Sequence, residues 1–458
     1  MSGLSRPSTV SDVIAEYVLN CRYEALPTNI KECARKTLLN SVSTAIGAHG
    51  LPDVDRALAY AREEGASGPC TTLVTGEKRP LATGIFVNGV MYNTLGQEET
   101  HLQSGTHPAE TTVPVILGLG EHVHASGVEV LEALVAGVEV TTAVAHMKLT
   151  PGVKYDLCEA PAVFGTIGAA SAAARLMKLD AHTTAEAVCL AANLAAGLSE
   201  CIKVGTAEYH FSVAAAGMHG YLAAALARTG AHAAPSSFEG KGGFYHLFAG
   251  VPTDKLASYD VAGDVQERLA SAWSIDELIF KPYPINYFNS VFVDGALHLA
   301  RDQGIQANEI DEVVIEVGTL AGFSGAMIRP PFLQRESVLG STGFLVACML
   351  ARGHVTLEDT LDVSAPDIMA IFDKTRILMT DQLVSCRIAV RTASGTSRFD
   401  GEVEGRDYRL SEDELGAIAS SILPDVLGAE RGSELVKSLR MVEGLADIST
   451  LIAQTVRS

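Results

Sequence analysis

Reactive side chains gather in three short segments that stand beside helix-breaking residues. They are QEETHLQSGTHPAE (97–110), KVGTAEYHFS (203–212) and FKPYPINYFNS (280–290). Imidazole titrates nearer to neutrality than any other side chain, so His107 is a candidate acid or base. An ammonium group such as that of Lys281 is suited to holding a carboxylate. Together the two would support proton transfer at a carbon next to a carboxylate.

The common catalytic signatures are absent from the sequence. It contains no P-loop, no strand-bound G-x-G-x-x-G, no H-E-x-x-H and no G-x-S-x-G. The eight cysteines are scattered, with neither a C-x-x-C pair nor a Cys/His cluster at zinc spacing. This pattern indicates reduced, mostly buried thiols in a cytoplasmic compartment. Any chemistry must therefore use ordinary side chains.

Length and composition predict a two-domain globular protein. The chain has 458 residues, whereas a single core stops growing at roughly 250 to 300. The formal charge of -20 disfavours binding to nucleic acid or to anionic lipid. The N-terminus lacks the apolar stretch of a secretion signal, and the most apolar window, from Val130, contains Glu132 and Glu139. A buried helix explains that window better than a membrane span does.

The first half of the sequence follows the helical period. Apolar residues recur every four positions between Asn29 and Ile46, and Gly47 with Gly50 ends the run. The same pattern predicts further helices at 82–96, 110–125, 127–147, 162–178, 184–200 and 212–229. Several are rich in Ala and Gly. A stripe of small residues could line a cofactor cavity, but close helix packing is the favoured interpretation.

The pattern changes after about residue 265. A strand is predicted at 313–317, then a helix from Ser337 to Arg352, and then a hairpin that turns at Ser394-Gly395. The last fifty residues return to the helical period. We therefore expect a mainly α protein with an α+β second domain: a helical domain over 1–267, an α+β lid domain over 268–405, and a helical return over 406–458.

At the three reactive segments the sequence resembles the MmgE/PrpD family, which includes 2-methylcitrate dehydratases, cis-aconitate decarboxylases and iminodisuccinate epimerase. The resemblance runs through FVNGVMYNTLGQEETH, HPAETTVPVILGLGE, PAVFGTIGAASAAARLMKLDA, GTAEYHFSVAAAGMHGYLAAALARTG and KPYPINYFNS. It implies a homodimer whose subunits each have a helical domain and an α+β lid. It also implies lyase or isomerase chemistry on a small carboxylate, without metal or organic cofactor, in a cleft between the domains.

The family motifs are only partly retained. Thr100 and His101 match the D-x-D-D-T-H segment, in which Gly96, Glu98 and Glu99 replace acidic aspartates. His107 matches the H-P histidine, and Lys281 matches the K-P-Y-P lysine, with Asn286 beyond it as a substrate contact. Three family cations are replaced or displaced: Tyr209 stands for a lysine, Ser212 for a histidine that neighbouring His210 could replace in part, and Glu159 for another histidine.

The lost cations predict a substrate with fewer than three carboxylates, or one with an amine that Glu159 or Glu98 would pair with. We expect His107 to transfer a proton, Lys281 to hold a carboxylate and Tyr209 to be a second proton donor. Thr100, His101, Glu99 and His210 would orient the substrate.

Simpler interpretations stay open for several of these residues. His107 could be only a structural hydrogen-bond donor, Lys281 a surface lysine, and Glu98 with Glu99 solvated loop charges. Three functions remain for the chain: a dehydratase or decarboxylase, an epimerase, and a non-catalytic binding relative.

Overall fold

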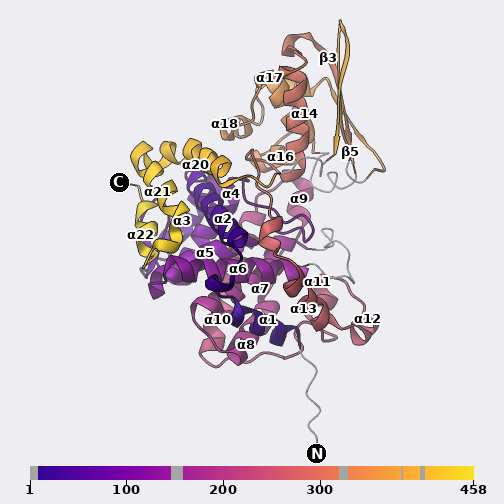
Figure 1. Ribbon diagram of the computed structural model, residues 1–458. Coiled ribbons are helices and arrows are strands. Elements are labelled where there is room, and N and C mark those ends of the chain that lie inside the picture. The colour runs from indigo at the N-terminus through magenta and orange to yellow at the C-terminus, as the bar shows by residue number, and fades with distance from the viewer. Residues whose placement is uncertain (1–8, 146–157, 319–327, 383–384, 403–407, 458) are drawn as a thin grey trace, which may run out of the picture.

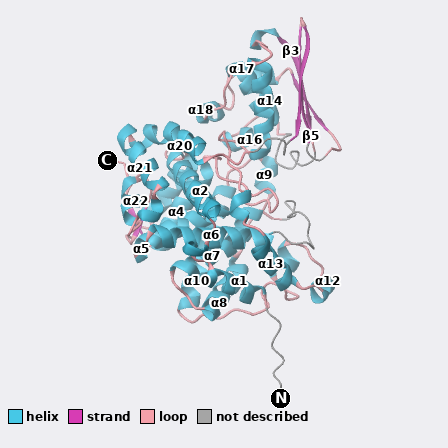
Figure 2. Cartoon of the chain, in the orientation of Figure 1, coloured by secondary structure: helices cyan, strands magenta, loops and turns pink. Residues whose placement is uncertain are grey.

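The computed structural model describes residues 9–145, 158–318, 328–382, 385–402 and 408–457, and it has the predicted architecture of a large helical domain and a smaller α+β domain (Figures 1 and 2). The helices of the first part of the large domain are α1 (Val10–Asn20), α2 (Thr28–Gly47), α3 (Pro52–Glu63), α4 (Leu81–Thr94), α5 (Pro108–Val123), α6 (Gly127–Ala145), α7 (Ala160–Leu176), α8 (Ala181–Leu194), α9 (Glu200–Val204), α10 (Tyr209–Arg228), α11 (Phe244–Phe248), α12 (Thr253–Ser258) and α13 (Val261–Ser271).

Helices α5, α6, α7 and α10 pack closely at the centre of the large domain. A Cβ atom added at Gly168 of α7 would come within 1.9 Å of the Thr141 hydroxyl oxygen of α6. One added at Gly220 of α10 would come within 2.5 Å of the Ala169 Cβ atom. The small residues are therefore needed for helix contact, as predicted, since a larger side chain would force the backbones apart.

Two acidic residues of α6 hold neighbouring segments in place. Glu132 pairs with Arg175 and also accepts a 2.9 Å hydrogen bond from the Tyr23 backbone N–H. Glu139 accepts hydrogen bonds of 2.9 Å from the backbone N–H groups of Ser274 and Ile275. These contacts explain the acids within an apolar helix. Among the described helices, none is long and apolar enough to cross a bilayer.

The C-terminal helices are α20 (Glu412–Leu427), α21 (Ala429–Arg440) and α22 (Ser449–Gln454). Both α20 and α21 pack against α2, and α22 contacts α5, so the chain ends on the large domain (Figure 1). All eight cysteines lie among the described residues, and each is buried and free of a disulfide.

The smaller domain has a four-stranded sheet in the order β4-β3-β5-β6. Its strands are β3 (Ile310–Val317), β4 (Thr375–Met379), β5 (Ser385–Thr392) and β6 (Gly395–Glu402), and its helices are α14 (Ser290–Arg301), α16 (Arg335–Leu339), α17 (Thr342–Arg352), α18 (Leu357–Leu361) and α19 (Pro366–Phe372). Alternate residues of β3, such as Val313 and Ile315, face the core, while Glu312 and Glu316 form ion pairs with arginines of β5. Helices α14, α17 and α19 contact the sheet.

The elements differ from the sequence predictions in three places. The predicted helix 184–200 ends at Leu194 and resumes as the short α9, and the predicted helix from Ser337 is divided between α16 and α17. Ser341 causes the second break, because its hydroxyl caps α17 by accepting from the Phe344 N–H. Strand β4 was not predicted, since only two of its five residues are buried. The predicted hairpin of β5 and β6 is confirmed, with Thr392 opposite Gly395.

Candidate active site

A cavity of about 180 Å³ lies between the two domains. The large domain contributes the α4–α5 loop, the start of α7 and the segment from α9 to α10, and the rest comes from residues around Lys281 and from α16. The predicted site residues that line it are Glu98, Thr100, His107, Glu159, Tyr209, Lys281 and Asn286. The structure therefore brings seven of the predicted residues to one space, whereas Glu99, His101 and His210 are not in its wall.

Backbone pairing fixes the α4–α5 loop to the segment that crosses between the domains. Thr100 and Ile279 exchange two hydrogen bonds, of 2.9 and 3.0 Å. The Gln97 side-chain amide donates to the Lys281 carbonyl over 3.2 Å, and the Asn40 amide donates to the Gln97 carbonyl over the same distance. Residues far apart in the sequence are thus held in register at the cavity.

A buried ion pair lies at the centre of the site. The Lys281 ammonium donates to Glu98 Oε1, and only 3% and 9% of these two side chains are exposed. The same carboxylate oxygen lies 4.0 Å from His107 Nε2. Burial raises the pKa of Glu98, but the charge of Lys281, joined by that of His107 when the imidazole is protonated, outweighs burial and the net direction is downward. Glu98 is therefore not a solvated loop charge, and Lys281 is not a surface lysine. The simpler interpretations of these two residues were wrong.

A backbone contact fixes the tautomer of His107. Its Nδ1 lies 2.6 Å from the Glu99 carbonyl oxygen, which can only accept, so Nδ1 carries the proton and Nε2 keeps its lone pair. Thr100 Oγ1 lies 3.2 Å from the same nitrogen. Burial and the nearby Lys281 lower the pKa of His107 to about 4. The imidazole is therefore neutral near pH 7 and able to accept a proton.

Glu99 and His101 support the loop and do not contact the cavity. Glu99 Oε1 accepts a 2.7 Å hydrogen bond from the Ala109 N–H, and burial raises the pKa of Glu99 to about 7. His101 is fully buried, with Ser104 Oγ 2.7 Å from its Nδ1 and Glu277 Oε2 2.8 Å from its Nε2. The D-x-D-D-T-H match did not separate residues that touch the cavity from those that shape the loop.

Glu159 presents a second acid to the cavity. It is the N-cap residue of α7, but its side chain makes no capping hydrogen bond and instead accepts from the Ser212 hydroxyl. Burial raises the pKa of Glu159 to about 8, in spite of the Ser212 hydrogen bond. Tyr209, the first residue of α10, also lines the cavity, and burial raises its pKa well above the ordinary value. Both groups are therefore protonated near neutral pH.

His210 lies behind the cavity wall in a polar network. Its Nδ1 contacts Asn93 Oδ1, and its Nε2 is 3.4 Å from Glu336 Oε1 and 4.0 Å from Asp53 Oδ2. Asp53, His210 and Glu336 carry ligand atoms within 4.8 Å of one another, so this set has the composition of a metal site. Its histidine is nevertheless already hydrogen-bonded on both nitrogens. The expected partial substitution for the family's histidine is thus not supported by its position.

Three important residues were not identified from the sequence. Glu110 lines the cavity beside His107; its Oε2 accepts from Asn93 over 2.5 Å, while its buried Oε1 has no partner among the described residues. Glu336 lines the opposite wall. Its neighbour Arg335 reaches the large domain, donating to the carbonyls of Thr94 and Leu95 over 2.7 Å. Glu110 lies within the 97–110 segment but was not singled out there. No motif marks Arg335 and Glu336, because their importance depends on where α16 lies.

Arg335 also binds within the crossing segment and its own domain. Its guanidinium donates to the Pro284 carbonyl over 3.1 Å and to the Thr360 hydroxyl over 3.0 Å. Arg335 is buried, with 6% of the residue exposed. Arg335 therefore joins the two walls of the cavity.

The sequence pattern of the MmgE/PrpD N-terminal domain matches residues 12–257, more than half of the chain. The chain belongs to the MmgE/PrpD family. The match includes α4, α5, α7 and α10, which carry the large domain's share of the cavity. The family assignment made from the three segments is thereby confirmed.

Characterised relatives of this MmgE/PrpD protein are distant but extend over most of its length. A human cis-aconitate decarboxylase is 24% identical over 398 residues, which cover 81% of this chain and 79% of the relative. The mouse cis-aconitate decarboxylase is 22% identical over 97% of this chain and 92% of its own. A cis-aconitate decarboxylase-like protein of Aspergillus oryzae is also 22% identical, over 97% and 96%. These similarities support an enzyme of the lyase type in this family.

Proposed function

We propose that this protein is a cofactor-independent lyase that removes carbon dioxide, or alternatively water, from a small dicarboxylate. The observation that carries the proposal is the meeting of His107 Nε2 and the Lys281 ammonium at one oxygen of Glu98 in the wall of the cavity. Decarboxylation is placed first because the relatives are named as decarboxylases. The identity of 22 to 24% leaves the particular acid to experiment.

The charge of the cavity supports a substrate with two carboxylates. Lys281 is partly neutralised by Glu98, and Glu159 occupies a position at which the family has a histidine. Partial compensation comes from helix dipoles, because His107, Glu159 and Tyr209 stand at the N-terminal ends of α5, α7 and α10. Each N-terminus carries roughly half a positive charge and favours an anion. Together with the ammonium groups of Lys203 and Lys281, these dipoles would hold two carboxylates better than three.

In the proposed reactions Glu159 is the acid, and dehydration also uses His107 as a base. Lys281 would hold a substrate carboxylate by sharing its N–H donors between Glu98 and the substrate. In decarboxylation the bond from carbon to the departing carboxylate breaks, and the electron pair left on the carbon skeleton takes a proton. Glu159 is suited to supply that proton, since its pKa of about 8 leaves it protonated at neutral pH. In dehydration, neutral His107 would remove a proton from carbon and Glu159 would protonate the departing hydroxyl.

A second candidate function is epimerisation of an amine-bearing carboxylate. It is favoured by the carboxyl oxygens in the cavity wall, which can accept hydrogen bonds from an ammonium group and belong to Glu98, Glu110, Glu159 and Glu336. An ammonium group on the substrate could bind the unpartnered oxygen of Glu110.

Incubation with candidate acids in heavy water, followed by NMR, tests these functions. Release of carbon dioxide with deuterium at the protonated carbon supports decarboxylation, and a new vinyl signal with loss of a hydroxyl supports dehydration. Deuterium exchange that leaves the carbon skeleton intact supports epimerisation. Ligand binding with no turnover of any acid would contradict all three activities and indicate a binding relative.

A further inference from the structure

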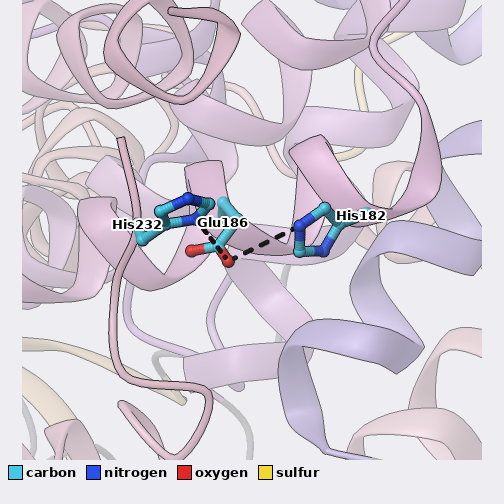
Figure 3. Close-up of side chains that lie close together, drawn as sticks. All are labelled: His182, Glu186 and His232. Atoms are coloured by element: carbon cyan, nitrogen blue, oxygen red, sulfur yellow. Dashed lines mark hydrogen bonds and ion pairs between the residues drawn. The ribbon is translucent and has the colours of Figure 1, made fainter. Parts of the chain in front are cut away.

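We propose that His182, Glu186 and His232 form a binding site for a divalent transition-metal ion, with zinc as the first candidate. The three side chains meet on the surface of the large domain and none of them lines the cavity (Figure 3). Their ligand atoms all lie within 4.8 Å of one another. Two imidazoles and one carboxylate are a donor set that binds zinc and related ions.

Two elements bring these residues together. His182 and Glu186 are four residues apart in the first half of α8, so they project from the same face of the helix. His232 follows the end of α10, whose last helical residue is Arg228. In Figure 3 the Glu186 carboxylate stands between the two imidazole rings. The ring centroids are 6.4 Å apart and the planes are inclined by 34°, which leaves space between the rings.

The Glu186 carboxylate is already oriented for such a role. Its Oε2 accepts a 2.7 Å hydrogen bond from the Ala233 backbone N–H, which fixes the plane of the carboxylate. Its Oε1 lies 3.3 Å from His232 Nδ1 and 3.9 Å from His182 Nε2. The carboxylate is 15% exposed, whereas the two imidazoles are 76% and 74% exposed. Glu186 is thus held in place, whereas the two exposed imidazoles are free to rotate toward an ion.

Small side-chain movements would complete a coordination sphere. Ligands about 2.0 to 2.1 Å from a tetrahedral zinc ion lie roughly 3.4 Å apart. The contact between Glu186 and His232 already has nearly this length, and His182 must approach Glu186 by a fraction of an ångström. The two histidine nitrogens, which lie within 4.8 Å of each other, must reach the same separation. Rotation of an exposed imidazole requires no repacking of the core. Three protein ligands leave a coordination position for water, which suits a surface site.

An ion bound here would join α8 to the segment that follows α10. Helix α8 already packs against α10, and Ala233 of the following segment donates to Glu186, so the ion would add a link that the unfolded chain lacks. Binding should therefore raise the melting temperature of the whole protein. The alternative is an ordinary cluster in which protonated histidines pair with Glu186, and that cluster has no need of metal.

Titration of the untagged, chelator-treated full chain with zinc chloride, by isothermal calorimetry, tests the proposal. We expect one strong site, which His182→Ala and His232→Ala each weaken by at least about tenfold. Both histidines are highly exposed, so these variants should fold normally, which circular dichroism checks. His122→Ala is the matched control, because His122 is another exposed histidine on a helix, in the last turn of α5.

A second variant separates this site from the set around His210. His210→Gln should leave the strong zinc site unchanged, and cobalt(II) added to the wild type should give an absorption spectrum that is lost in His182→Ala. Zinc binding that survives in both surface variants but is lost in His210→Gln would overturn the proposal and place the ion near Asp53 and Glu336. Absence of binding at millimolar zinc would overturn it as well.

Discussion

The buried acids of α6 and those of the cavity wall are chemically alike but differ in how their oxygens are used. Glu139 of α6 and Glu159 of the cavity both have a pKa that burial raises, to about 7 and about 8. Both oxygens of Glu139 accept backbone N–H groups. Glu159 instead accepts from one hydroxyl and faces open space, and its neighbour Glu110 keeps one oxygen without a partner among the described residues. A fully bonded acid holds the fold, whereas one that faces open space is available to a substrate.

The largest effect that follows from this comparison is expected at the ion pair. Lys281→Met should lower kcat/KM by about 10² to 10³, because it removes the proposed cationic partner of the substrate. It should also destabilise the fold, by about 3 to 5 kcal/mol, since Glu98 is left as a buried, unpaired charge. Steady-state kinetics and thermal unfolding measure the two effects.

The double variant Lys281→Met/Glu98→Gln is the control for that experiment. It removes both charges and should recover most of the lost stability without recovering activity. Recovery of activity along with stability would show that Lys281 has only a structural role.

The next largest effect concerns the acid in the cavity wall. Glu159→Gln should lower kcat by about 10², because it removes the proposed proton donor and keeps the size of the side chain. Its melting temperature should change little, since a neutral carboxyl is replaced by a neutral amide. Ser212→Ala serves as the matched variant, because it removes the hydroxyl that bonds Glu159 and leaves the acid in place. Full activity in Glu159→Gln would assign the proton to another group, with Tyr209 as the first candidate.

Glu139→Gln should show the opposite behaviour. An amide oxygen can accept from only one of Ser274 and Ile275, so the other N–H faces an NH₂ group, at a cost of about 1 to 3 kcal/mol. Urea denaturation would measure that loss, and kcat of the folded enzyme should be unchanged. A fall in kcat without a fall in stability would contradict the distinction between the two regions.

The smallest effect is a pH dependence set by the cavity. His107 must be neutral to act as base, so dehydration or epimerisation should decline as pH falls through about 4. Glu159 must be protonated to act as acid, so activity should decline as pH rises through about 8, roughly tenfold for each further unit. Plots of kcat/KM against pH test both limbs, and Glu159→Gln should lack the alkaline one. An alkaline limb that persists in this variant would show that a different group supplies the proton.

Much of the fold could be predicted because it depends on local patterns. The four-residue spacing predicted the helix α2, although every residue from Thr37 to Ile46 is buried and not one face alone. The alternation in β5 does report which face of the strand is buried. The division between α16 and α17 was less accessible, because the Ser341 cap competes with an apolar pattern that would continue the helix.

The sequence predicted several of the residues that line the site but not how these residues contact one another. Seven candidates reached the cavity wall, since motifs preserve which segments meet. The pairing of Lys281 with Glu98 and the contacts of Arg335 with Thr94 join segments more than a hundred residues apart. The tautomer of His107 depends on a single backbone carbonyl. Such contacts produce no recognisable pattern of residue types or spacing in the sequence.

The acceptors of Arg335 in the other wall have a consequence for how the enzyme tolerates change. Thr94, Leu95 and Pro284 each offer a main-chain carbonyl, which every amino acid possesses. Substitutions at those three positions therefore keep the acceptors, provided that the backbone keeps its course. Position 335 has no such freedom, because a planar guanidinium is needed to reach several carbonyls at once. These contacts between α16 and the other wall of the cavity therefore depend on the identity of residue 335 and not on the identities of the three residues whose carbonyls it reaches.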